Sequence, residues 1–84
     1  MKIKIMDLYE KNELRQIRQK SVYHDYQLMC LELMSKNDLQ DPKILISLMF
    51  KLISTVKNQS ELKDRLLAVY DLYLGMERGM RIPA

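Results

Sequence analysis

An aspartate precedes, and a proline begins, the most apolar stretch of the chain, residues 42–57. Asp is a strong helix N-cap, and Pro in the first helical turn loses no needed hydrogen bond and already has a helical φ, so Asp41-Pro42 predicts a helix start. The apolar residues that follow form two adjoining helical stripes: Leu45, Leu48, Met49, Leu52 and Val56, and beside them Ile46, Phe50 and Ile53. So wide an apolar surface predicts a central helix that is buried on more than one side.

The segment before this helix is also predicted to be helical. Asp7 with Glu10 fits a capping box, and further along Val22, Tyr26, Met29 and Leu33 recur at helical spacing. No Gly or Pro enforces a stop near residue 20, so we expect one long helix over residues 7–35, straight or bent. Ser21 could instead begin a second helix, because serine caps free N–H groups.

A last helix is predicted over residues 60–78. Asn58 with Glu61 fits a capping box at its start, and Gly79 is a plausible C-terminal stop. Its apolar residues have the cleanest heptad spacing in the chain: Leu62, Leu66, Val69, Tyr73 and Met76.

The predicted fold class is therefore all-α, a three-helix antiparallel bundle or a helical hairpin with a long N-terminal helix. The 84 residues form one small domain, 1–84, with 48% hydrophobic residues and only two Gly and two Pro. A chain of this size buries only about 60% of the surface that its unfolded form exposes. Its own core should be marginal, and docking onto another molecule could supply the missing burial.

The single cysteine, Cys30, cannot form an internal disulfide, so a reducing cytoplasm is the expected compartment. The N-terminus lacks the apolar stretch of a signal peptide, and no stretch has the roughly 18 consecutive apolar residues expected of a membrane-spanning helix.

Residues for catalysis or metal binding are not grouped in the sequence. His24 and Cys30 lie six positions apart on one predicted helix and point roughly 120° apart, so they cannot form a nucleophile and base pair. Cys30 is expected to be a small core residue and His24 a surface group. We therefore expect a protein that is not an enzyme and that has no cofactor and no metal site.

A basic stripe on the first predicted helix offers an alternative function. Lys11, Arg15 and Arg18 share one face and could neutralise DNA phosphates. A solvated helix face explains the same three charges, and Glu10 and Glu13 interrupt this surface. DNA contact is the weaker hypothesis.

Tyrosines and methionines are frequent, with five Tyr and seven Met in the chain. Tyr combines a large apolar body with a polar tip, as interface anchors do. Met surfaces adapt to different partners, although core packing explains the methionines on or beside the apolar stripes better. The candidate partner-binding residues are Tyr9, Leu14, Ile17, Tyr23, Tyr26, Phe50, Tyr70, Tyr73 and Met76.

Two resemblances bear on function. The first concerns Asn37-Asp38-Leu39, Pro42, Ile44-Leu45, Leu48, Phe50, Leu52, Asp71-Leu72 and Gly75-Met76, whose spacing resembles the second half of type III secretion needle subunits. It implies a helical hairpin that stacks into a filament, or one of the small helical chaperones that hold needle subunits. The second concerns Gln27, Ser35, Ile44, Ser47-Leu48, Leu52 and Arg65, which resemble enterobacterial connector proteins of biofilm and envelope signalling.

Together these observations favour a non-catalytic helical regulator or adaptor that docks onto another protein, or onto itself as a homodimer or oligomer, in a bacterial cell. A needle subunit or needle chaperone is the first alternative, and a small dimeric DNA-binding regulator is the second.

Overall fold

The computed structural model describes residues 5–37 and 41–79, and all of its regular elements are helical. A short 3₁₀ helix, η1 (Ile5–Leu8), precedes α1 (Lys11–Arg18), α2 (Ser21–Lys36), α3 (Lys43–Thr55) and α4 (Gln59–Glu77). The predicted all-α class is thus confirmed. Residues 1–4, 38–40 and 80–84 lie outside the described residues.

The single helix predicted over residues 7–35 is wrong. Lys20 has extended backbone angles, φ −77° and ψ 142°, and separates α1 from α2. The N–H groups of Gln19 and Lys20 donate to the carbonyls of Gln16 and Ile17, which closes the last turn of α1. α2 then begins at Ser21, the alternative that serine capping suggested, although Lys20 occupies the cap position.

The first capping box was also placed too early. α1 begins after Glu10, whose N–H donates to the Glu13 carboxylate at 3.1 Å, whereas Asp7 lies in η1. The later helix starts agree better with the sequence. The Asn58 side chain accepts the N–H of Glu61 at 3.0 Å, and the Asp41 carboxylate accepts the N–H of Lys43 at 3.0 Å.

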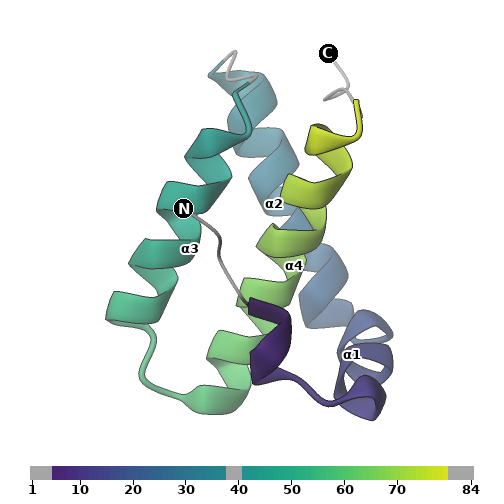
Figure 1. Cartoon of the computed structure of the whole chain (residues 1–84). Coiled ribbons are helices and arrows are strands. Elements are labelled where there is room, and N and C mark those ends of the chain that lie inside the picture. The colour runs from purple at the N-terminus through teal and green to yellow at the C-terminus, as the bar shows by residue number, and fades with distance from the viewer. Residues whose placement is uncertain (1–4, 38–40, 80–84) are drawn as a thin grey trace.

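The central helix is α4, whereas the sequence had pointed to the helix after Asp41-Pro42. Figure 1 shows α4 between α2 and α3, whose axes draw closer together toward the end of α2 and the start of α3. The predicted heptad of α4 lies in or against the main core, together with Cys30 and Met34 of α2 and Leu45 and Met49 of α3. α4 is buried on several sides because α1, α2, α3 and η1 all pack against it.

α3 is buried along one stripe only, formed by Leu45, Met49 and Leu52. Of the second stripe, Phe50 is 43% exposed and Ile53 is 48% exposed. The prediction of burial on more than one side of this helix is therefore wrong. α3 has α4 as its main packing partner, so its outer apolar residues have no helix against them in the described part of the chain.

α4 ends as predicted. Gly79 has φ 96°, in the left-handed region that favours glycine, and its N–H donates to the Met76 carbonyl at 3.0 Å.

Candidate protein-docking surface

Three of the four apolar residues that recur at helical spacing on α2 are exposed. Val22 is 39% exposed, Met29 is 50% exposed and Leu33 is 56% exposed, whereas Tyr23, Cys30 and Met34 are buried. α2 carries apolar residues on nearly all sides, so apolar spacing alone cannot select the buried face. The packed face therefore follows from contacts with α4, and a second apolar stripe is left at the surface.

Polar contacts explain which face of α2 packs. The Gln27 side chain donates to the Ala68 carbonyl at 3.1 Å and to the Tyr23 hydroxyl at 3.0 Å, and the Tyr23 hydroxyl in turn donates to the Asp71 carboxylate. If α2 were rotated about its axis to bury its other apolar stripe, Gln27 and the Tyr23 hydroxyl would turn away from these partners. These polar contacts therefore favour the observed rotation of α2.

A cleft of about 260 Å³ lies beside the exposed stripe of α2. It is lined by Ser21, Val22, Asp25, Tyr26, Met29 and Arg65. We call this cleft together with Leu33, one turn further along α2, the α2 groove. It combines exposed apolar groups with an aromatic ring and with charges of both signs, which is the composition of many protein interfaces.

Arg65 forms the α4 wall of the α2 groove. Its guanidinium carbon lies 5.5 Å from the centre of the Tyr26 ring, and it forms an ion pair with Glu61. Burial raises the pKa of Tyr26 above its usual value, so its hydroxyl stays protonated at neutral pH. The groove is therefore held by a charged and aromatic pair from two helices.

A second cleft, of about 290 Å³, lies between α4, α1 and the link at Lys20, and ion pairs join its walls. Lys63 lies 2.9 Å from the Glu13 carboxylate, and Lys20 lies 3.2 Å from that of Asp64. Nearby, the Tyr9 hydroxyl donates to the Lys63 carbonyl at 2.6 Å, and burial strongly raises its pKa. The Lys63–Glu13 pair holds α1 against α4, and the Lys20–Asp64 pair holds the link between α1 and α2 against α4. These charges are already paired with one another.

The candidate partner-binding residues separate into three groups. Ile17 and Tyr23 are buried, and they form a small core with Leu67 and Ala68. Half-buried residues packed against one of the two cores are Tyr9, Leu14, Tyr26, Tyr70, Tyr73 and Met76. Phe50 is exposed. Whether any of them contacts a partner stays a prediction, but Tyr26 is the one that lines the α2 groove.

Three exposed groove residues were not proposed as partner-binding residues: Val22, Met29 and Leu33. Their spacing along one helix was visible in the sequence, but it was interpreted only as evidence for the helix. A surplus of apolar residues on α2, more than one buried face can use, was the signal that could have identified them.

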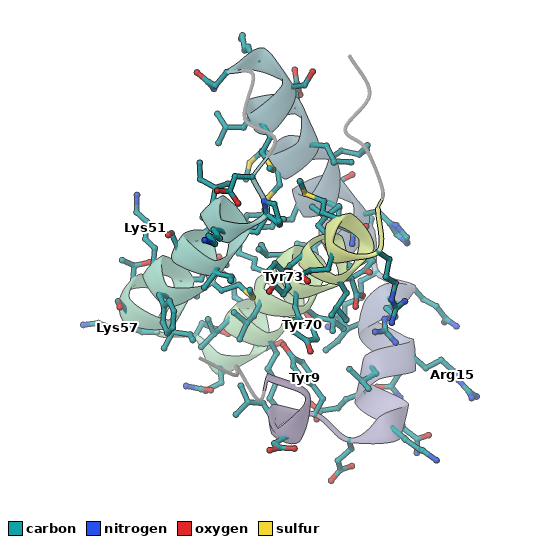
Figure 2. All side chains as sticks on the ribbon, turned by 45° about the horizontal axis from the view of Figure 1, so that its top comes forward. Tyr9, Arg15, Lys51, Lys57, Tyr70 and Tyr73 are labelled. Atoms are coloured by element: carbon teal, nitrogen blue, oxygen red, sulfur yellow. The ribbon has the colours of Figure 1, made fainter. Side chains whose placement is uncertain are left out.

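The basic stripe is divided by the tertiary structure. Arg18 forms an ion pair with Asp71 at 2.9 Å, whereas Lys11 and Arg15 are exposed on α1. Figure 2 shows Arg15 extending away from the bundle. DNA contact by these residues stays a prediction.

Side chains that could serve in catalysis or metal binding are dispersed over the described part of the chain. Cys30 is 2% exposed, within the main core, and His24 is exposed and lies edge-on to the Tyr23 ring, as expected from the sequence. In residues 5–37 and 41–79, no group of three or more His, Cys, Asp or Glu side chains could hold a metal ion. Within the same ranges no helix has the length and apolar character to cross a bilayer.

The chain matches no protein-family model, no curated protein and no solved structure. The resemblances to type III secretion proteins and to connector proteins therefore stay predictions.

Proposed function

We propose that this protein is a non-catalytic adaptor or regulator of a bacterial cytoplasm, and that it works by docking an amphipathic helix of another protein into the α2 groove. One observation carries the proposal. Val22, Met29 and Leu33 share one exposed face of α2, beside a cleft with Tyr26 and Arg65. Leaving three large apolar side chains in water forgoes stabilisation that burial would supply, roughly 1 to 2 kcal/mol for each.

The groove suits a helical partner because its apolar residues are spaced over about three turns of α2. Helix-in-groove recognition uses apolar anchors at such spacing, with charges at the edge fixing orientation. Met29 can adapt to the shape of an anchor, while Tyr26 and Arg65 offer a rigid, partly charged wall.

The test is affinity capture from the native cell with a matched pair of variants. Met29→Gln with Leu33→Gln removes apolar character from the groove, whereas Leu28→Gln does so at a residue of α2 that is 63% exposed but lies on another side of the helix. We expect the wild type and the Leu28 variant to retain the same stoichiometric protein, and the groove variant to lose it. Equal capture by all three, or no stoichiometric protein with any of them, would count against the proposal.

A further inference from the structure

The outer side of α3 is a second exposed apolar surface, and its charge is basic. Phe50 and Ile53 are exposed, and Ile46 beside them is half-buried. Lys43 and Lys57 are exposed near them, Lys51 is exposed on another side of α3, and residues 42–58 contain no acid. Figure 2 shows Lys51 and Lys57 extending away from the bundle. We call Ile46, Phe50 and Ile53, together with Lys43 and Lys57, the α3 face.

The α2 groove has the opposite charge along its outer edge. Asp25 and Glu32 are both exposed, and a spacing of seven residues brings them to nearly the same side of α2. Asp25 also lines the cleft itself, next to Val22 and Met29. Each surface thus places a row of apolar side chains beside charges, acidic on α2 and basic on α3, with Lys36 as a base at the far end of α2.

We propose that the α2 groove of one copy of this chain receives the α3 face of a second copy. The inference rests on the proposed function, because it assigns an occupant to the same groove. Phe50 and Ile53 would enter between Met29, Leu33 and Tyr26, and the lysines of α3 would lie along the acidic edge. The chain itself supplies an amphipathic helix of the charge that this groove requires.

Charge disfavours the symmetric alternatives. Two α3 faces packed antiparallel about Phe50 would bring Lys43 of one copy near Lys57 of the other, and two α2 grooves would bring their acidic edges together. Juxtaposed like charges oppose both arrangements, whereas the mixed contact between α2 and α3 pairs acids with lysines.

The mixed contact is head to tail. The two surfaces belong to helices on either side of α4 (Figure 1), so joining two copies leaves one groove and one α3 face open at the ends. Further copies can then add until a ring closes. The average mass in solution should rise steadily with protein concentration and fall when salt screens the charges.

The experiment is a charge exchange followed by sedimentation velocity, with folding of every variant checked by circular dichroism. Asp25→Lys with Glu32→Lys makes the groove edge basic, and Lys43→Glu with Lys57→Glu makes the α3 face acidic. We expect each variant alone to associate about tenfold more weakly than the wild type or not at all. Their equimolar mixture should associate again, because every contact between unlike copies is then complementary.

Lys11→Glu with Arg15→Glu is the matched control, since it reverses two exposed bases of α1 that belong to neither surface. It should leave association unchanged. A wild type that stays monomeric at all concentrations, or a mixture that stays as weak as its components, would overturn the inference.

Failure of this inference is distinguishable from failure of the proposed function. If the wild type is monomeric but captures a protein that the Met29→Gln with Leu33→Gln variant does not, self-docking is contradicted and the adaptor role is supported. If the mixture of charge-exchanged variants associates again but no other protein is captured, self-docking is supported and the adaptor role is contradicted.

Discussion

The Arg18 guanidinium donates two parallel hydrogen bonds to the Asp71 carboxylate, from Nε and Nη2, each 2.9 Å long. This pair joins the end of α1 to the middle of α4, and the Tyr23 hydroxyl of α2 donates to the same carboxylate. Three helices thus meet at one acid. A continuous helix over residues 7–35 would place Arg18 and Tyr23 in different positions. The contacts of both residues with Asp71 therefore form together with the break in the helix at Lys20.

Asp71→Asn should lower the free energy of unfolding by about 1 to 2 kcal/mol. The neutral amide keeps the size of the side chain but loses the ion pair and one acceptor, and half-exposure of Arg18 limits the loss through solvent screening. Urea unfolding at pH 7 measures the change. Asp7→Asn, at an exposed acid of η1, is the control and should change stability by less than about 0.5 kcal/mol.

Stability should fall in alkaline solution as Tyr23 ionises. Burial, and then the hydrogen bond to Asp71, raise the pKa of Tyr23 from 10.0 to about 12. The folded state therefore holds the phenolic proton more tightly than the unfolded state, so this contribution is complete below pH 10 and is lost as the pH rises through 12. Urea unfolding across this range should show a loss of roughly 1 kcal/mol or more that Tyr23→Phe reduces. An equal loss in the variant would contradict the assignment to Tyr23.

Ser21→Pro should be tolerated. Ser21 is the first residue of α2, where the N–H has no partner within its helix, and the extended angles of Lys20 suit a residue before proline. We expect the stability to stay within about 1 kcal/mol of the wild type. Glu32→Pro, inside the same helix, should cost about 3 kcal/mol or more. Comparable damage from both prolines would indicate an unbroken helix through residue 20.

Cys30 should resist thiol reagents in the folded protein. Its side chain is 2% exposed, and burial raises the pKa of its thiol from 9.0 to about 11, so little thiolate forms near neutral pH. Reaction with a chromogenic disulfide at pH 8 should be slow in buffer and rapid in urea. A fast reaction without denaturant would show that α2 opens readily from the core.

Local sequence signals predicted the second half of the chain well. Asp41-Pro42, Asn58 with Glu61, and Gly79 act through backbone groups within a few residues of themselves, so α3 and α4 begin and end within two residues of the predicted bounds. The predicted heptad of α4 lies in or against the main core. Leu67 and Ala68, on another side of the helix, are buried as well because several helices surround α4.

The first half was predicted less well, because its decisive contacts are distant in the chain. Neither Gly nor Pro marks the break at Lys20, and the partners that accompany it, Asp64 and Asp71, lie more than 40 residues away. The buried face of α2 depends likewise on the reach of Gln27 to Ala68. As a result, apolar residues that indicated only a helix in the sequence became the candidate docking surface.

The sequence by itself therefore determined the helical class, the ends of α3 and α4, and the lone buried cysteine, since these follow from local hydrogen bonding and composition. Only the tertiary structure decided that α4, not α3, is central, and that apolar residues of α2 and α3 remain in water with opposite charges beside them. The physical reason is that a helix with more apolar residues than one buried face can hold gives no local indication of which ones its neighbours will cover.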